Sequence, residues 1–467
     1  MTYKLVISAI IASSLSALPA IAKTSVTKGN GTVRIANEHV AMEFADNGSF
    51  DIVSMKFAGT EMAKPGDNRQ PWSLTYLGEQ GETPTIEPRY AVYHGWREED
   101  CDTSKAIVFS WHTRLKYDGN NYPVEMRVSL DDNADLLRWN LSANVPDNWT
   151  ITNFVFPNIA IDSPVEGKVI TPGGWGNEYA LKENGDYEAN YPSWNASMQM
   201  IMLDSKKGTF YFSPEDRNAC GKMMRIREKD GAVSFRTEVA AAAPYPCYAR
   251  NHNHPAGGGE FWYNSYRDMM AELRESHLRK DNIVFSEENA ECYIPCFDIL
   301  LTVNTPHNPD CRIVPLFPLI YSDRVLTCAY TYSPYTDVTK GEFRYQNMQC
   351  FLYGSQLGWV DPRLLWVNEK AEYEALFLRN LTNLRKKQHD VFTGGRYIAE
   401  VIPTGDNPIV DVHTFGKDYV VKGAIWESPK GKRVMYVVNS DSVRHTVTLP
   451  DGKSLTIEPI TGKRINL

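Results

Sequence analysis

The hydrophobic pattern in the first half of the chain alternates with a period of two residues. Apolar side chains occupy every second position at Val40, Met42 and Phe44, and the alternation resumes after the turn sequence NG. The same pattern returns in VEMRVSL and, after DDNAD, in LLRWNL. Alternation over many short segments is typical of strands with one face toward a core and one toward water. Residues 23–245 are therefore predicted to form a large antiparallel β-sandwich.

Beyond about residue 246 the pattern changes to helical spacing and continuous apolar runs. The runs IVFSE and CRIVPLFPLIYSD are typical of parallel strands, which are covered on both faces. Helices are predicted in the first half of FRYQNMQCFLYGSQLGW and in NEKAEYEALFLRNLTNLRKK, which Asn368 can cap. A further helix, NSYRDMMAELRESHL, carries a stripe at Tyr266, Met269, Met270, Leu273 and His277. Strands that alternate with helices predict βα units for residues 246–391.

The last part of the chain, residues 392–467, returns to the period of two. The sequence KRVMYVVNSDSVRHTVTLPDGKSLTIEPITG reads as a meander with turns at NS and DG. We therefore predict a C-terminal β-sandwich. The predicted fold class is multidomain, β plus α/β.

The first residues have the features of an export signal. Lys4 precedes an apolar run from Leu5 to Leu18, and the sequence AIA at 20–22 has the small-x-small form of a signal peptidase site. We expect residues 1–22 to be a signal peptide, and the protein to be secreted or periplasmic with a mature chain that begins near Lys23. The apolar run is too short and too rich in serine for a spanning helix, and no later segment predicts one.

Composition narrows the set of partners and cofactors. The formal net charge of -8 argues against nucleic acid or an anionic membrane as a partner. An exported protein can form disulfides, but the spacing of the eight cysteines fixes no pairing and includes no CxxC pair for zinc. No P-loop, dinucleotide-binding fingerprint or G-x-S-x-G motif is present. We therefore predict neither a metal nor a cofactor.

Three carboxylates follow the short apolar run that ends at Phe285. The sequence SEENAE places Glu287, Glu288 and Glu291 there. In parallel βα folds, ligand-binding groups lie at the C-terminal ends of the strands. A pair of carboxylates can cleave a glycosidic bond, one as the acid and one as nucleophile or base, and carboxylates also bind sugar hydroxyls. The alternative interpretation is a solvated first turn of a helix, where glutamate is favoured by the helix dipole.

Two further motifs carry groups that suit a sugar. CYARNHNHPAGGGEFW places His252 and His254 on one face of an extended segment, and because no third ligand is evident, sugar binding is favoured over a metal. GSQLGWVD places Trp359 after a helix, where its ring is either a platform for a sugar or part of a core.

As a set, these motifs resemble those of bacterial secreted glycoside-hydrolase-like proteins. The resemblance is carried by YPSWNASMQM, HNHPAGGGEFW, SEENAECYIPCFD, VPLFPLIY and FLYGSQLGW, in that order. Such proteins combine a galactose-mutarotase-like β-supersandwich, a (β/α)8 barrel and a C-terminal β-sandwich, and related architectures occur in α-galactosidases and endo-α-N-acetylgalactosaminidases. The resemblance implies that VPLFPLIY is the last barrel strand. It also implies that Glu287 and Glu291 point into the active-site mouth, with Asp298 on the following helix.

The predicted βα region is too short for a whole barrel. A (β/α)8 barrel takes about 250 residues, whereas residues 246–391 have room for about half of the strands. We therefore predict a partial barrel that lacks its first half. In the enzymes that the chain resembles, a strand in that half carries the carboxylate nucleophile, and no residue here inherits this role.

The resulting prediction is a protein that hydrolyses or binds an oligosaccharide or polysaccharide. Glu287 is the candidate acid/base and Glu288 or Glu291 the second carboxylate. The candidate substrate-binding residues are Glu291, His252, His254, Asp298 and Trp359. The alternative is a non-catalytic carbohydrate-binding or structural remnant, which would lack two carboxylates facing each other at about 5 to 10 Å across a cleft. Because a half barrel exposes two sheet edges, self-association into a homo-oligomer is an expected response.

Overall fold

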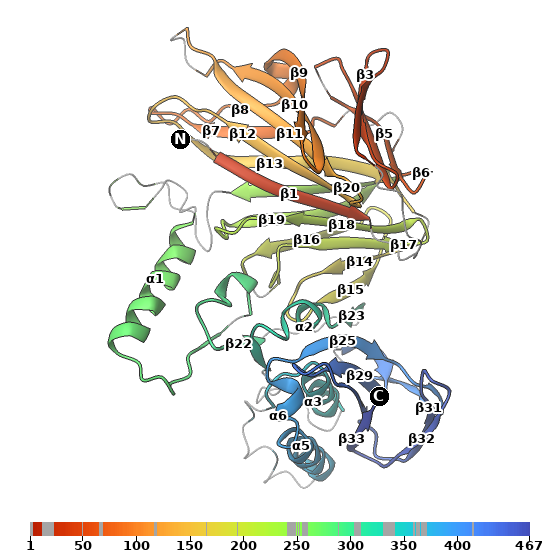
Figure 1. Ribbon diagram of the computed structural model, residues 1–467. Helices are drawn as coiled ribbons and strands as arrows, with labels where there is room; N and C mark the ends of the chain where they lie inside the picture. The colour runs from red at the N-terminus through yellow and green to blue at the C-terminus, as the bar shows by residue number, and fades with distance from the viewer. Residues whose placement is uncertain are drawn as a thin grey trace. The chain divides into compact units, whose positions relative to one another are not determined.

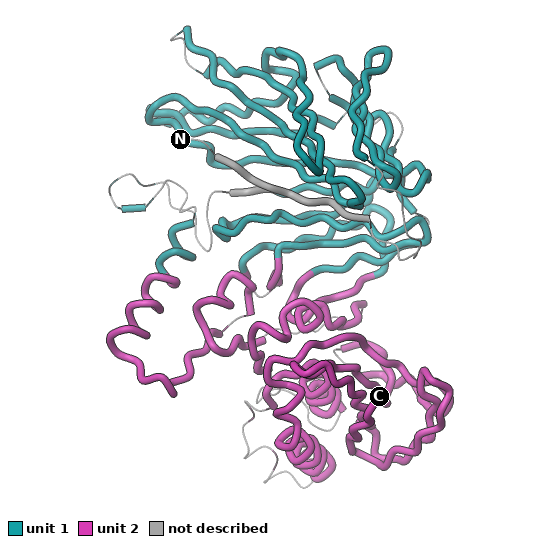
Figure 2. The backbone as a smooth tube through the Cα atoms, viewed as in Figure 1, with its two compact units in different colours: residues 1–171, 180–192, 199–265 teal, residues 172–179, 193–198, 266–467 magenta. Residues whose placement is uncertain are grey.

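The computed structural model describes most of the chain (Figure 1). The described residues are 3–11, 23–48, 50–64, 69–115, 119–164, 166–193, 195–240, 249, 251, 253–254, 260–287, 289–302, 310–329, 341–357, 360, 365, 371–412 and 415–467. The chain divides into two compact units (Figure 2). Unit 1 comprises residues 1–171, 180–192 and 199–265, and unit 2 comprises residues 172–179, 193–198 and 266–467. The predicted class, β-rich and multidomain, is confirmed.

Unit 1 is built from antiparallel strands. One run of neighbouring strands is β14 (Gly167–Thr171), β17 (Ile201–Ser205), β18 (Gly208–Pro214), β1 (Tyr3–Ile11), β12 (Leu136–Ala143), β11 (Tyr122–Asp131), β10 (Ser104–Thr113) and β9 (Val92–Cys101). A second sheet is β16 (Asp186–Tyr191), β19 (Lys222–Lys229), β20 (Ala232–Ala240), β13 (Thr150–Asp162), β7 (Ser73–Leu77) and β8 (Thr85–Ile86). A third is β2 (Ser25–Lys28), β3 (Thr32–Ala36), β4 (Val40–Ala45), β5 (Ile52–Phe57) and β6 (Thr60–Glu61), and a single 3-10 turn, η1, spans Pro88–Tyr90.

Aromatic side chains join these sheets face to face. Phe44 on β4 lies 5.2 Å from Phe109 on β10 and 5.7 Å from Trp139 on β12, measured between ring centroids. Phe210 on β18 lies 4.2 Å from Phe235 on β20. The alternation at Val40, Met42 and Phe44 is therefore confirmed as a buried face, because the apolar positions point into this layered core.

The segment predicted to be a signal peptide contributes strand β1. Its backbone pairs antiparallel with β12, with Leu5 opposite Leu141, and with β18, with Ile7 opposite Pro214. Cleavage before Lys23 would remove this strand from between its two neighbours. The signal peptide itself stays a prediction.

Unit 2 contains three short parallel strands, β21 (Phe285–Ser286), β22 (Ile299–Thr302) and β24 (Leu326–Ala329). A further parallel bridge joins Cys328 to Gln356. The helices are α1 (Phe261–Ser276), which crosses from unit 1, the 3-10 turn η2 (Glu291–Tyr293), α2 (Leu316–Tyr321), α3 (Glu342–Leu352), α5 (Glu372–Arg385) and α6 (His389–Phe392). Parallel pairing agrees with the predicted βα units, and the partial barrel stays a prediction.

The run VPLFPLIY was expected to be the last barrel strand, and this expectation is wrong. Its residues form helix α2, preceded by the short strand β23 (Cys311–Ile313), which pairs antiparallel with β15 (Asn177–Ala180). Pro315 and Pro318 have no N–H group and cannot donate to a neighbouring strand. The first turn of a helix tolerates proline, because its N–H groups have no partner within the helix. The third parallel strand is β24, which comes from the sequence after α2.

Helix α1 exposes much of its predicted apolar stripe. Met270 is buried, but Tyr266 and Met269 are 38% and 46% exposed. Tyr266 contacts Tyr293 edge-on at 5.6 Å between centroids, and Phe285 on the adjoining edge strand is 55% exposed. An exposed stripe of this kind fits a βα array in which some covering elements are missing.

The C-terminal region consists of two facing sheets and a small ribbon. The first sheet is β25 (Arg396–Val401), β29 (Val421–Glu427), β30 (Arg433–Asn439) and β33 (Thr461–Asn466); the second is β26 (Thr404–Gly405), β31 (His445–Thr448) and β32 (Ser454–Ile457). The ribbon pairs β27 (Ile409–Asp411) with β28 (Lys417–Tyr419). One face of the first sheet packs on the second through residues such as Val437 and Val447. Its other face packs through Trp426 and Tyr436 on Phe351 and Phe392, so helices assigned by sequence to the preceding domain share its core.

A network of charged side chains is buried in this region, and we call it the Lys422 network. The Lys422 side chain is 0% exposed, and its Nζ lies 2.8 Å from Oε1 of Glu400 and 2.9 Å from Oδ2 of Asp418. Arg312 pairs with Glu400 at 2.7 Å, and the Tyr345 hydroxyl donates to Asp418. Burial alone would raise the pKa of Asp418, but Lys422 and the hydrogen bonds outweigh it and lower this pKa. The two carboxylates likewise raise the pKa of Lys422 against the opposing effect of its burial.

Candidate functional site

The candidate site lies where the parallel strands end. The register pairs Ser286 with Leu300 and Leu300 with Thr327, so the C-terminal ends of β21, β22 and β24 face the same edge of the sheet. Glu287 is the first residue after β21 and its side chain is exposed. The structure thus places this carboxylate directly after a parallel strand, as predicted. An exposed carboxylate at a strand end is free to accept hydrogen bonds from a hydroxyl-bearing ligand.

The segment after Glu287 is fixed by two stretches that come from far earlier in the chain. Asn289 is 2% exposed, and its side-chain amide donates to the carbonyl of Gly174 at 2.8 Å. The Ser197 hydroxyl donates to the same carbonyl at 3.0 Å and to that of Pro172 at 2.8 Å. The backbone N–H of Glu291 in turn donates to the Ser197 carbonyl at 2.7 Å. Glu287 is therefore held on a well-anchored turn.

The carboxylate of Glu291 has a contact within unit 2. Its Oε2 accepts a hydrogen bond from the Tyr321 hydroxyl on α2 at 2.5 Å, and the side chain is half-buried. This contact ties η2 to α2 and so steadies the turn that carries Glu287. Substrate binding by Glu291 stays a prediction.

Asp298 was expected on a helix at the active-site mouth, and this position is wrong. Pro295 follows a single 3-10 turn, and Asp298 lies immediately before β22. Its backbone N–H donates to the Val284 carbonyl at 2.8 Å, and its carboxylate accepts from the Val284 N–H at 2.9 Å and from Arg274 at 3.1 Å. These bonds start the β21–β22 pairing, so Asp298 lies at the opposite end of the strands from Glu287.

The remaining candidates are divided between described and undescribed parts of the chain. His254 belongs to unit 1, where its ring centroid lies 5.4 Å from that of Phe261. His252, Glu288 and Trp359 lie outside the described residues. Sugar binding by His254 stays a prediction.

Within the described ranges, no group of three or more His, Cys, Asp and Glu side chains is arranged to hold a metal ion. In the same ranges, no helix has the length and apolar character needed to cross a bilayer.

Sequence reasoning missed the anchoring residues Asn289, Ser197 and Tyr321. Asn289 lies in the sequence between Glu288 and Glu291, and its role as an anchor is evident only from its burial in the structure. Ser197 belongs to YPSWNASMQM, a motif used for the resemblance without a role being assigned to it. The available signal was the glycine-rich PGGWG at 172–176, since such a segment permits close backbone approach.

Part of the chain matches the model of a protein family. The model of a family described as "Domain of unknown function (DUF6259)" matches residues 223–332. This range begins in β19 and extends just beyond β24, so it includes Glu287 and its anchored turn.

Two curated relatives are named as glycoside hydrolases. A protein of Bacteroides thetaiotaomicron named "Putative glycoside hydrolase" is 27% identical over 654 residues, covering 95% of this chain and 97% of the relative. The alignment exceeds the 467 residues of this chain, so the relative has residues without a counterpart here. A Monosiga brevicollis protein with the same descriptive name is 28% identical over 254 residues, covering 47% of this chain and 21% of the relative.

Among solved structures, a glycoside hydrolase family 81 protein from Clostridium thermocellum aligns with 95% of this chain and 86% of its own, at 10% identity and a TM-score of 0.14. The sequence likeness to the Bacteroides protein, which extends over nearly the whole of both chains, indicates glycoside-hydrolase-like ancestry for this chain.

Proposed function

We propose that this chain is an exported carbohydrate-binding protein of glycoside hydrolase ancestry. Its sugar site would lie at the C-terminal edge of β21, β22 and β24, with Glu287 as a principal ligand for sugar hydroxyls. The observation that carries the proposal is the position of Glu287, which is exposed at a parallel strand end on a turn fixed by Asn289 and Glu291. The names of the two relatives support a carbohydrate as the ligand.

Weak or absent hydrolysis is part of the proposal. Glycosidases ordinarily need two carboxylates on opposite sides of the scissile bond. In the parts of the chain that the structure describes, Glu287 is the carboxylate directly following a parallel strand. The relative has residues without a counterpart in this chain, which supports the loss of barrel strands from this chain. One of the lost strands would have carried the second carboxylate. The exposed edges of such a partial barrel also favour pairing with a second copy.

The second candidate function is a working glycoside hydrolase, and the names of both relatives favour it. In that case Glu287 would act as the acid/base and Glu288 as the second carboxylate. His252, His254 and Trp359 remain candidate sugar ligands in either function. The two functions differ in turnover, which an assay measures directly.

Replacing Glu287 by glutamine is expected to weaken glycan binding about tenfold or more, since a hydrogen bond to a charged group contributes about 1.5–3 kcal/mol. The ligand would first be found by probing a glycan array with the wild-type protein, and affinities would then be measured by calorimetry. Stability should change by less than about 0.5 kcal/mol because Glu287 is exposed.

The matched control is Glu272→Gln, which removes an exposed carboxylate from α1. Equal binding by both variants would contradict the proposed site. The same proteins would be assayed on α- and β-linked aryl glycosides and oligosaccharides. If the wild-type protein turns over a substrate at about 1 s⁻¹ or more and Glu287→Gln does not, the protein is a glycoside hydrolase and the binding proposal is wrong.

Export predicts a defined new N-terminus. When the full-length gene is expressed in a bacterium, the protein recovered outside the cytoplasm should begin at or near Lys23. Edman sequencing or mass spectrometry of the intact chain measures this. Ala22→Leu should block the cut, because signal peptidase requires a small residue there. A cytoplasmic product that keeps Met1 would refute the prediction.

A further inference from the structure

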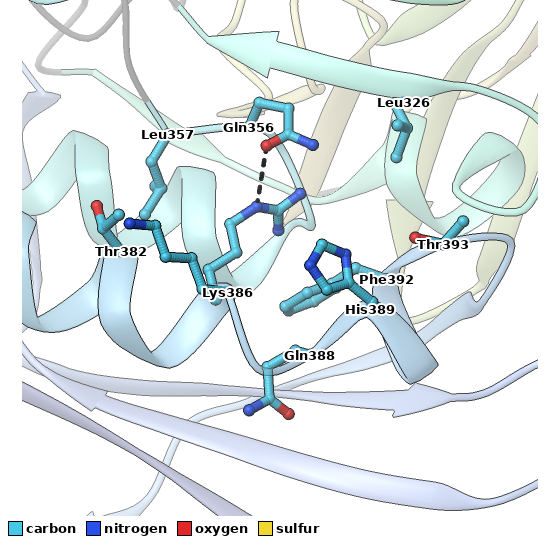
Figure 3. Close-up of a pocket in the computed structure, with 10 residues that line it drawn as sticks. Leu326, Gln356, Leu357, Thr382, Lys386, Gln388, His389, Phe392 and Thr393 are labelled. Carbon is cyan, nitrogen blue, oxygen red and sulfur yellow. Dashed lines mark hydrogen bonds between the residues drawn. The ribbon is translucent and has the colours of Figure 1, made fainter.

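A pocket of about 180 Å³ lies in unit 2, among elements that do not include β21 or the turn carrying Glu287 (Figure 3). Its walls come from the start of β24, the segment that follows α3, the end of α5, and α6. The volume is below the roughly 300 Å³ at which pockets for drug-sized ligands begin. The pocket therefore suits a free ion or a single sugar ring.

The side chains around this pocket are basic or neutral. Arg385, Lys386 and His389 supply the nitrogen groups, Thr382 and Thr393 supply hydroxyls, and none of the lining residues is an aspartate or glutamate. This composition differs from that of the whole chain, whose formal charge is -8. A concave site with one sign of charge concentrates counter-ions of the other sign.

Arg385 is the fixed charge of the pocket. Its Nη2 donates to the Gly354 carbonyl at 2.8 Å, its Nε donates to Gln356 at 3.4 Å, and its guanidinium lies over the Phe392 ring at 4.7 Å. Its Nη1 is buried and has no hydrogen-bond partner among the described residues. Burial lowers the pKa of Arg385 to about 10, so the group is still protonated at neutral pH.

Among the residues that the structure describes, no carboxylate neutralises this guanidinium. Across the described ranges, no carboxylate lies within 4.0 Å of Arg385. Two fully enclosed lysines are paired by contrast: Lys222 lies 3.0 Å from Asp216, and Lys422 lies between Glu400 and Asp418. The hydrogen bonds to Gly354 and Gln356 account for two nitrogens of Arg385, but both acceptors are neutral. A half-buried charge without a counter-charge is partly desolvated, and an anionic ligand would offset that cost.

We infer that this pocket binds a small oxyanion, either the carboxylate of an acidic sugar or a free inorganic sulfate or phosphate. Arg385 provides the fixed positive charge at its base, and the exposed side chains of Lys386 and His389 complete the site at its mouth. The planar guanidinium matches the paired oxygens of such anions. The inference does not depend on the sugar site at Glu287, because the two use different residues.

The test is titration calorimetry of the whole protein with four probes at constant ionic strength. These are sodium glucuronate, glucose as its neutral counterpart, sodium sulfate and sodium phosphate, each against a sodium chloride background. Glucuronate or an inorganic oxyanion should bind, and glucose should not. Tighter binding of glucuronate would identify an acidic sugar as the ligand, and tighter binding of sulfate or phosphate would identify a free inorganic ion.

Arg385→Gln and Lys386→Gln should each weaken anion binding about tenfold, since each removes one unit of charge from the pocket. Lys386 is exposed, so its variant keeps the test valid if Arg385→Gln fails to fold. Lys430→Gln removes one exposed positive charge elsewhere in unit 2 and is the control. No binding above the chloride background, equal binding of glucose, or equal weakening by Lys430→Gln would overturn the inference.

Discussion

Replacing Lys422 by methionine should lower the free energy of unfolding by about 3–5 kcal/mol, the range measured when one partner of a buried ion pair is removed. The Lys422 side chain is fully enclosed and is the cation shared by Glu400 and Asp418. Without it, Asp418 is a buried carboxylate whose remaining support is the hydrogen bond from Tyr345 and the Tyr419 N–H. Unfolding by guanidinium chloride, fitted with separate transitions for the two units, measures the loss.

The control for this change is Lys417→Met, which removes an exposed lysine from β28. It should alter stability by less than about 0.5 kcal/mol. A loss below about 1 kcal/mol for Lys422→Met would contradict the expected role of the network.

The same pair of proteins should differ in how stability depends on pH. Because the pKa of Asp418 is lowered in the folded protein, Asp418 stabilises the fold at every pH above the ordinary aspartate pKa. This stabilisation is lost as the pH falls through the lowered pKa. Because the pKa of Lys422 is raised in the folded protein, Lys422 stabilises the fold at every pH below the ordinary lysine pKa. This stabilisation is lost as the pH rises through the raised pKa. The difference between wild type and Lys422→Met should therefore be fully developed between roughly pH 4 and pH 10 and should shrink outside that window.

Trp175→Ala should also destabilise unit 2 by about 3–5 kcal/mol, as expected for a large aromatic side chain removed from a core. Trp175 is 1% exposed, its ring lies edge-on to Tyr353 at 5.2 Å, and its carbonyl accepts the Phe317 N–H at 2.8 Å. The ring belongs to the core that also contains Phe351 and Trp426. Differential scanning calorimetry would show a lower transition temperature for unit 2.

Trp262→Ala is the matched control for this prediction. Its side chain is 37% exposed on α1, so its removal should cost far less than that of Trp175. Similar losses in the two variants would mean that Trp175 does not anchor unit 2.

The sequence predicted those parts of the structure that depend on local periodicity. The alternation at Val40, Met42 and Phe44 identified a buried face, because a strand with one wet side must alternate. Glu287 was placed correctly because the strand before it is marked by a short apolar run. Pro315 and Pro318 could have corrected the strand predicted at VPLFPLIY, but continuous hydrophobicity does not distinguish a buried helix from a buried strand.

The rest of the site depends on contacts between distant segments, and periodicity contains no information about these. The hydrogen bond from Asn289 to Gly174 joins residues 115 positions apart. Asp298 illustrates the same limit. Its carboxylate suggested a ligand, but its actual partners, Val284 and Arg274, are set by how the strands begin to pair.

The discontinuous make-up of unit 2 limits how this gene can be divided. A fragment that starts at Tyr266 would encode β23 without its partner β15, and Asn289 without the carbonyl of Gly174. It would also omit Trp175 from the core. Recombination that exchanges the C-terminal half as a block would break these pairings unless the segment 172–198 came from the same parent. Unit 2 is thus encoded by separate stretches of sequence, 172–179, 193–198 and 266–467, and chimaeras with relatives should fold only when all of them come from the same parent.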